Sequence, residues 1–422
     1  MTASMTAGMT AGMTGRMKGR MKGRMNGSVH SNTESEQHLR EIFAAAIAAV
    51  GGQQATSAAL ERIQLGERVR LLAFGKAADA MAQGALEQLG NRLQAGLLVT
   101  KHGHLDASVQ RHPLIEYHEA AHPVPDAASL KAGDAVCRFV AETPDTDHLL
   151  VLISGGGSAL VESLIDGLTL TDLQARTDEL LASGAAIGEI NRERRRLSRI
   201  KGGRLLSMLG HCRVTQLLIS DVPGDRLADI ASGPLVAVGN EGSAADDASA
   251  RVETHLVATN ALARTAASQR ARALGYVVRD KDGSLDGDVN EVAARLIDAM
   301  PSAAGEVVIF GGESTVVLPP NPGRGGRNQH LAALVAKDIG GEGELVALAC
   351  GTDGTDGPTD AAGGIVNGYT AEAGGVEALE AALQAADAGT WLESAGALVR
   401  TGPTGTNVMD LALLARRFEA PG

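Results

Sequence analysis

The feature that most constrains the fold is an alternation of short apolar runs with longer stretches of helical periodicity. Strand-like runs that are apolar on both faces occupy residues 69–74, 96–100, 148–153, 214–219, 306–310 and 345–350. Helical patterns occupy residues 38–50, 77–89, 126–140, 170–183, 260–274 and 287–300. Strands of this kind, separated by helices, predict a parallel sheet that is covered on both sides. The sequence therefore predicts an α/β protein.

The length of the chain indicates more than one domain. At about 100–200 residues per domain, 422 residues predict two domains. We expect an N-terminal α/β domain over residues 33–300 and a smaller C-terminal one over residues 301–422. Residues 1–32 differ from both, because Met recurs every four residues from Met1 to Met25 among Gly, Thr and basic residues, without one acid. Glycine in a helix costs about 1 kcal/mol, so we expect this segment to be a disordered low-complexity extension.

Composition excludes several classes of protein. The net charge is −12 and only 2% of residues are aromatic, which argues against nucleic acid as a partner. No stretch approaches the roughly 20 apolar residues that span a bilayer, so no membrane association is expected. The three cysteines, Cys137, Cys212 and Cys350, are far apart and lack CxxC spacing. This predicts neither a disulfide framework nor a zinc site and indicates a cytoplasmic protein.

A glycine-rich loop follows the strand expected at 148–153, in the order Ser154-Gly155-Gly156-Gly157-Ser158. In open α/β sheets, ligands bind at such carboxyl ends of strands, where backbone N–H groups and a helix N-terminus attract anions. The loop is therefore interpreted as a phosphate or carboxylate cradle, with a tight structural turn as the alternative. It matches neither the dinucleotide fingerprint nor the P-loop pattern.

Charged residues follow several other strands. Lys76 comes after the first strand, Asp221 and Asp225 follow the strand at 214–219, and Asp353 and Asp356 follow the strand at 345–350. Paired carboxylates of this kind suit a divalent cation or a proton acceptor, whereas their alternative role is to form turns. The spacing of the second pair is not that of a calcium-binding EF-hand.

Two basic segments interrupt an otherwise acidic chain. One runs through residues 191–204, and the other, a glycine-rich turn, carries Arg324 and Arg327. Guanidinium groups match phosphate and carboxylate in a two-pronged geometry. The first segment can also be read as a solvated charged face. The histidines lack metal-ligand spacing, and no serine lies in a nucleophile-elbow context, so hydrolase chemistry is unsupported.

Together these segments resemble the glycerate 2-kinases of the MOFRL family, which were formerly labelled hydroxypyruvate reductases. The matching segments are GKAADAMA (75–82), TKHGH (100–104), HPVPD (122–126), SGGGSAL (154–160), LSRIKGGRL (197–205), SDVPGD (220–225), ASGP (231–234), GGEST (311–315), GRGGRNQ (323–329), GTDGTDGPTDAAGG (351–364) and TGPTGTNVMDL (401–411). They span nearly the whole chain after residue 32. One departure is Met409, where the family more often has Asn, and this puts one polar contact in doubt.

The resemblance implies a Rossmann-like N-terminal domain, a smaller MOFRL domain and an active site in the cleft between them. It also implies ATP-dependent phosphorylation of D-glycerate at the 2-hydroxyl, with Mg²⁺, giving 2-phosphoglycerate and ADP. The partners expected are these small molecules, and a homodimer is kept open.

On this basis each candidate site residue receives a role. The catalytic residues are Lys76, Arg327, Asp221 and Asp225. Nucleotide or phosphate binding is expected from Ser154, Gly155, Gly156, Gly157, Ser158, Asn260 and Glu313. Substrate binding is expected from Lys76, Arg196, Lys201, Arg327, Asn328, Thr404 and Asn407. The candidate metal ligands are Asp221, Asp225, Asp353 and Asp356.

Two other functions compete with the kinase. An NAD(P)H-dependent hydroxypyruvate reductase needs a dinucleotide site, whose fingerprint is missing. A non-catalytic sugar- or nucleotide-binding module is disfavoured, because an anion sensor gains nothing from carboxylates in its pocket.

Overall fold

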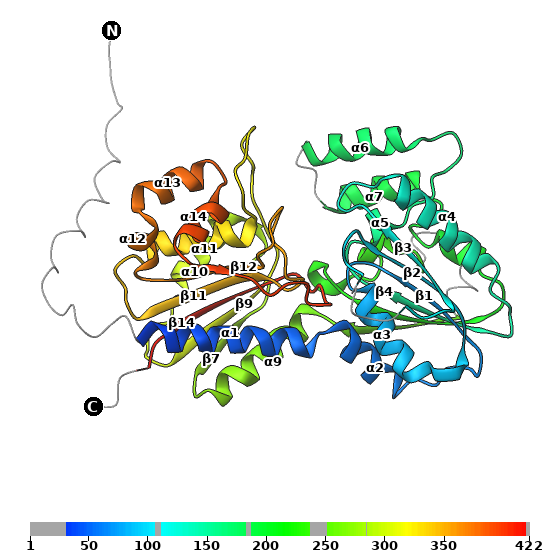
Figure 1. Ribbon diagram of the computed structural model, residues 1–422, viewed down its shortest axis with the longest axis horizontal. Helices are drawn as coiled ribbons and strands as arrows, with labels where there is room; N and C mark the ends of the chain where they lie inside the picture. The colour runs from blue at the N-terminus through cyan, green and yellow to red at the C-terminus, as the bar shows by residue number, and fades with distance from the viewer. Residues whose placement is uncertain (1–30, 106–110, 183–186, 237–250, 284, 419–422) are drawn as a thin grey trace, which may run out of the picture.

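The computed structural model describes residues 31–105, 111–182, 187–236, 251–283 and 285–418, which form two six-stranded sheets side by side (Figure 1). Of the extension expected at residues 1–32, residues 1–30 lie outside the described residues. A helix begins at Ser31. The first sheet has the order β3-β2-β1-β4-β5-β6, and all its neighbouring strands are parallel. Its strands are β1 Val69–Phe74, β2 Leu93–Lys101, β3 Ile115–Ala120, β4 His148–Ile153, β5 Arg213–Ile219 and β6 Val252–Ala258.

Helices cover both faces of the first sheet. They are α2 Gly52–Leu60 and α3 Ala78–Leu89 on one face, and α4 Ala127–Ala141 and α5 Gly157–Leu160 on the other. Helix α7 Ile187–Leu197 packs on the 3₁₀ turn Ile230–Ser232, and α6 Leu170–Ala182 packs on α7; further 3₁₀ turns lie at Gly90–Arg92, Arg204–Met208 and Pro223–Asp225. Alternate residues of each central strand point to opposite faces. In β1, Leu71 and Ala73 therefore pack on the side of α3, while Leu72 and Phe74 pack on the side of α4. The two-sided burial explains why these strands are apolar throughout.

The second sheet has the order β13-β12-β11-β14-β9-β7. Its strands are β7 Val277–Lys281, β9 Glu306–Gly312, β11 Leu345–Gly351, β12 Gly363–Asn367, β13 Leu398–Val399 and β14 Asp410–Arg416, and a small separate ladder joins β8 Gly287–Asp288 to β10 Ser314–Thr315. Helices α1 Ser31–Ala49 and α9 Asn260–Ala273 cover one face. The other face packs against helices α10 Val289–Asp298, α11 Arg327–Asp338, α12 Thr370–Gly374, α13 Val376–Gln384 and α14 Ala388–Ser394.

The expectation of parallel strands is confirmed for the first sheet and is wrong for most of the second. Strand β7 pairs with β9 in parallel, but β9, β14, β11, β12 and β13 pair antiparallel in succession. The cause is visible between β11 and β12, where residues 352–362 form a loop without a helix. A parallel return would require a crossover connection, usually through a helix.

The second sheet also begins earlier in the chain than the boundary expected at residue 300. Strand β7, at Val277–Lys281, hydrogen-bonds to β9. Helix α1, although it opens the described chain, packs against α9, β11 and β14 rather than against the first sheet (Figure 1). The two halves of the molecule are therefore interleaved in sequence. Among the described residues, no helix combines the length and apolarity needed to cross a membrane.

Candidate active site

The carboxyl ends of β1, β4 and β5 bring three of the expected site segments together. Phe74 pairs with Ile153, and Ile153 pairs with Leu218, so the residues that follow these strands lie at one edge of the sheet. The backbone N–H of Lys76 donates to the Gly155 carbonyl at 2.9 Å, and the N–H of Ala77 donates to Ser154 Oγ at 2.9 Å. The glycine-rich loop is thus fixed to the start of α3.

Gly155 allows two side chains to approach the loop backbone closely. A Cβ atom at Gly155 would lie 1.8 Å from Asp221 Oδ2 and 2.4 Å from Asn407 Nδ2. These two atoms are joined by a hydrogen bond of 2.9 Å, in which Asn407 donates. Because Gly155 has no side chain, Asp221 and Asn407 can lie directly against the loop backbone. The glycine is therefore needed for more than the tight turn itself. At its far end, Ser158 Oγ hydrogen-bonds to Ser232 Oγ at 2.8 Å.

Lys76 links the two sheets through an ion pair. Its Nζ lies 2.9 Å from Asp353 Oδ2, on the loop that follows β11, and the two side chains are 17% and 13% exposed. Burial acts to lower the pKa of Lys76, but the charge and hydrogen bond of Asp353 outweigh it and raise that pKa. Burial raises the pKa of Asp221. Lys76 therefore stays charged beside a carboxyl that is poised to take a proton or a cation.

Arg327 forms the second charged centre, at the start of α11. Its Nε and Nη2 donate to Asp410 Oδ2 and Oδ1 at 2.6 and 3.0 Å, and its Nη1 lies 2.9 Å from Glu313 Oε1. The Glu313 side chain is 38% exposed, and partial desolvation of its carboxyl, together with the charges of Asp410 and Asp221, raises its pKa to about 7 despite the attraction of Arg327. Asp410 was not among the expected site residues, although it lies within the matched segment 401–411.

Asp356 was expected to be a metal ligand, but its carboxylate binds the start of helix α11. Its carboxylate accepts hydrogen bonds from the backbone N–H groups of Asn328 at 3.1 Å and Gln329 at 2.8 Å, and from Asn328 Nδ2 at 3.4 Å. Burial raises its pKa to about 7. Asp356 therefore holds the first turn of α11, which carries Arg327, and Asn328 is part of this structural contact.

Several other expected site residues lie apart from the two charged centres. Lys201 pairs with Glu162 in the interior, where each side chain is 1% exposed. Arg196 is 72% exposed and pairs with Glu193 on the same helix. Such positions give Lys201 no access to a ligand and leave Arg196 in solvent.

Asn260 and Asp225 have contacts that differ from their expected roles, whereas Thr404 lines a cavity beside Lys76, as a substrate-binding residue should. Asn260 Nδ2 donates to the carbonyls of Val408 and Asp410 at 2.8 and 3.1 Å, so its amide fastens β14. Thr404 Oγ1 donates to the Thr352 carbonyl at 2.6 Å. Asp225, on a 3₁₀ turn, forms no side-chain hydrogen bond or ion pair with another described residue.

Met409 adopts a backbone conformation that explains the departure noted in the sequence. Its φ is +68°, in the left-handed region that Asn tolerates better than Met. Its carbonyl accepts hydrogen bonds from Thr352 N and Oγ1 at 3.0 and 2.6 Å. The Asn that is usual here therefore suits the backbone, and a lost polar contact is not needed to explain it.

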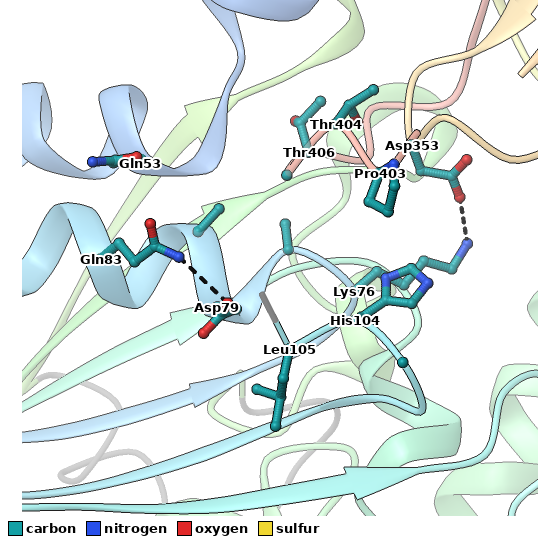
Figure 2. Close-up of a pocket in the computed structure, with 14 residues that line it drawn as sticks. Gln53, Lys76, Asp79, Gln83, His104, Leu105, Asp353, Pro403, Thr404 and Thr406 are labelled. Carbon is teal, nitrogen blue, oxygen red and sulfur yellow. Dashed lines mark hydrogen bonds and ion pairs between the residues drawn. The ribbon is translucent and has the colours of Figure 1, made fainter. Parts of the chain in front are cut away.

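A cavity of about 410 Å³ opens beside Lys76. Figure 2 shows Lys76, His104 and Asp353 at one end, and Gln53, Asp79 and Gln83 from α2 and α3 at the other. The segment Pro403–Thr406, ahead of β14, completes the wall. The cavity is therefore shared between the two halves of the chain, and its volume is in the range of small-molecule sites, about 300–1,000 Å³.

Comparison with known proteins agrees with this architecture. Residues 38–266 match a domain of unknown function, DUF4147, and residues 306–410 match the MOFRL family. A protein of Thermotoga maritima named D-glycerate 2-kinase is 37% identical over 88% of this chain and 96% of its own length. A protein of Agrobacterium vitis named putative hydroxypyruvate reductase is 35% identical over 90% of this chain and 94% of its own.

A solved structure extends the likeness to three dimensions. The crystal structure of a glycerate kinase from Thermotoga maritima superposes with a TM-score of 0.79 at 37% identity, covering 91% of this chain and 100% of that one. The chain therefore belongs to the MOFRL family, in which a DUF4147 domain precedes the MOFRL domain.

Proposed function

We propose that the protein transfers a phosphoryl group from ATP to the 2-hydroxyl of D-glycerate, giving 2-phosphoglycerate and ADP. The observation that carries this proposal is that Lys76, which lines the cavity, and Arg327 each pair with carboxylates, and that Lys76 lies within electrostatic reach of Glu313, the partner of Arg327. Phosphoryl transfer depends mostly on positioning and on neutralising the charge of the transferred group. The names of the relatives, D-glycerate 2-kinase and glycerate kinase, support the same reaction.

The two cations have distinct parts in this proposal. Lysine has three N–H donors and uses one on Asp353, so two remain for oxygens of the phosphoryl group. Arg327 is held in place by its two bonds to Asp410, while its Nη1 lies 2.9 Å from Glu313 Oε1. In this proposal the same guanidinium also contacts the transferred phosphoryl group. Cations fixed before the reaction stabilise the transition state without the cost of reorganising it.

Glu313 is the proposed acceptor of the hydroxyl proton. A general base works best when its pKa is near the working pH, and the pKa of Glu313 is raised to about 7. As the 2-hydroxyl oxygen forms its bond to phosphorus, its proton passes to the Glu313 carboxylate. The bond from phosphorus to the bridging oxygen of ADP breaks in the same step.

The donor set at the site suits Mg²⁺. Asp221 offers a buried carboxylate whose raised pKa would be relieved by a cation, and Glu313 lies within its electrostatic reach. Within the described part of the chain, no group of three or more His, Cys, Asp or Glu side chains is arranged to hold a metal. Mg²⁺ usually takes one or two carboxylates and completes its shell with phosphate oxygens and water, so the Asp221 carboxylate is the part of this site that would hold it. Mg²⁺ held by Asp221 would neutralise charge on the donor phosphates.

Reduction of hydroxypyruvate remains the second candidate, because relatives carry that name. The loop after β4 leads into α5, a helix of only four residues, and lacks the dinucleotide fingerprint. We also propose a cytoplasmic location, which the free thiols of Cys137, Cys212 and Cys350 support.

One experiment separates the two reactions. Purified protein is incubated with ATP, Mg²⁺ and D-glycerate, and the product is identified by phosphorus NMR; a parallel sample receives NADH and hydroxypyruvate. The proposal predicts 2-phosphoglycerate in the first sample and no NADH oxidation in the second. A 3-phosphoglycerate signal would overturn the position of transfer, and oxidation of NADH without phosphoryl transfer would overturn the kinase.

A further inference from the structure

Basic side chains converge on His122 at the edge of the first sheet, next to the glycine-rich loop. Lys101 ends β2 and is paired in register with Ala120, the last residue of β3, two residues before His122. A Cβ atom at Gly156 would lie 3.1 Å from both His122 Cδ2 and Lys76 Cγ. The imidazole and the stem of Lys76 thus flank the loop.

Arg194 lies on helix α7, which reaches the far end of the same loop: Ser232 Oγ donates to Asn191 Oδ1 on this helix at 3.3 Å and hydrogen-bonds to Ser158 Oγ at 2.8 Å. Both Arg194 and Lys101 lie within electrostatic reach of His122, as do Lys76 and Asp353. Burial, followed by the charges of the three cations, lowers the pKa of His122 to about 3, so the imidazole is neutral. Burial also lowers the pKa of Arg194.

Among the charges that act on His122, the positive ones outnumber the negative ones. Asp353 is paired with Lys76, and Glu162, the carboxylate that faces Arg194, is paired through Oε2 with Lys201. Within the described chain, neither Lys101 nor Arg194 forms a salt bridge. Three cations therefore act on His122 against one carboxylate, and that carboxylate is already paired with one of them. Such an excess of partly buried positive charge is stabilised by an anion that carries several charges.

We propose that Lys101 and Arg194 bind the polyphosphate of the nucleotide donor, across the Gly155–Gly157 loop on the first-sheet side of Lys76. The opposite side of Lys76, toward Arg327 and Glu313, is then left to D-glycerate. The inference rests on the proposed function and adds to it two residues that belong to no expected site. A carboxylate carries one charge and would neutralise one of these cations, whereas a triphosphate neutralises all of them.

The test measures binding separately from turnover. The variants Lys101→Ala, Arg194→Ala and Arg194→Lys are compared with Arg192→Ala, an exposed residue of the same helix. Calorimetry gives Kd for inorganic tripolyphosphate and for ATP, steady-state kinetics gives KM for D-glycerate, and thermal melting checks folding.

We expect Lys101→Ala and Arg194→Ala each to raise the Kd for both polyphosphates at least about tenfold, which corresponds to 1.4 kcal/mol. Arg194→Lys should recover only part of the loss, because a point charge cannot replace the planar fork. The Kd values of Arg192→Ala for both polyphosphates should stay within about threefold of wild type. The KM for D-glycerate should stay within the same range in all variants.

Three results would overturn the inference: unchanged polyphosphate binding in both alanine variants, no polyphosphate binding by the wild type, or a loss confined to D-glycerate. Weakened tripolyphosphate binding in a protein that phosphorylates no glycerate would support the anion site and overturn only the proposed function.

Discussion

At the scale of single residues, Glu313 gives the sharpest pH prediction. Its pKa is raised to about 7, and only the carboxylate can accept a proton. We expect kcat/KM to rise about tenfold per pH unit below pH 7 and to level off above it. Glu313→Gln should lower kcat/KM by about 10²–10⁴ and remove this limb.

The measurement is a pH profile of kcat/KM with saturating ATP. A separate measurement confirms that the protein stays folded at each pH. A wild-type limb that persists unchanged in Glu313→Gln would assign the titration to another group.

Lys201 and Glu162 provide a stability prediction. Each side chain is 1% exposed, and removal of one partner leaves a buried charge unpaired. Lys201→Met should therefore lower the free energy of unfolding by about 3–5 kcal/mol, while the double variant Lys201→Met with Glu162→Leu should recover much of it. Urea unfolding of both variants checks this. A stable Lys201→Met protein with a raised KM for D-glycerate would instead restore the substrate-binding role expected from the sequence.

At the scale of elements, the glycine-rich loop depends on the space at Gly155. Gly155→Ala places a Cβ atom 1.8 Å from Asp221 Oδ2, so Asp221 or the loop must move. A displacement of this size can cost about 10² in rate, whereas overpacking costs about 1–3 kcal/mol of stability. Gly340→Ala is the matched control, because its Cβ atom would meet nothing closer than 3.4 Å. Steady-state kinetics equal to wild type for Gly155→Ala would reduce the loop to a turn.

The start of α11 depends on Asp356. The pKa of this buried carboxyl is about 7 in the folded protein against 3.8 as the ordinary value. A raised carboxyl pKa means that the native state binds the proton more tightly. The stability that Asp356 contributes is therefore present below about pH 4 and lost as the pH rises through 7.

Asp356→Asn removes this titration. The difference in unfolding free energy between wild type and variant should fall steadily between about pH 4 and pH 7 and then remain constant. Denaturant melts at several pH values measure it. A difference that is flat across this range would contradict the raised pKa.

The strands show which elements of the fold could be predicted from the sequence and which could not. Strands β1, β4 and β5 were predicted within one residue, because they are apolar on both faces. The edge strands β3 and β6 were missed because their side chains are half-buried and polar. Strand β12 was missed because it opens with two glycines, which read as a loop. Gly363 is needed there, since a Cβ atom would lie 1.9 Å from the Ala349 carbonyl.

For the site, position at a strand end proved more informative than residue type. Lys76, Gly155 and Asp221 follow adjacent strands of one parallel sheet, so their meeting could be predicted. The direction of a side chain on a helix or in a loop could not. Lys201 and Arg196 are as basic as Lys76, yet one faces the interior and the other faces solvent.

At the scale of the whole molecule, the active site depends on contacts between the two sheets. Besides Lys76 with Asp353 and Asn407 with Asp221, the Gly52 N–H donates to the Gly405 carbonyl at 3.0 Å, and Thr406 Oγ1 donates to the Val50 carbonyl at 2.6 Å. The segment that contains Thr406 leads into β14, which carries Asp410 and so holds Arg327. Lys76 and Arg327 thus have fixed positions only when both halves of the chain are assembled.

The most direct test of this account is single-turnover phosphoryl transfer by Lys76→Ala and Arg327→Ala, with Lys337→Ala on α11 as the control. Lys337 is 46% exposed in a surface ion pair with Glu380, which contributes only about 0–1 kcal/mol of stability. If both cations neutralise the transferring group, each site variant, while still folded, should lose at least about 10² in rate, or ~2.7 kcal/mol. Arg327→Lys should recover only part of it, because lysine lacks the two-pronged contact with Asp410. Rates within about threefold of wild type for both alanine variants would contradict the assignment and move the active site away from the junction of the two sheets.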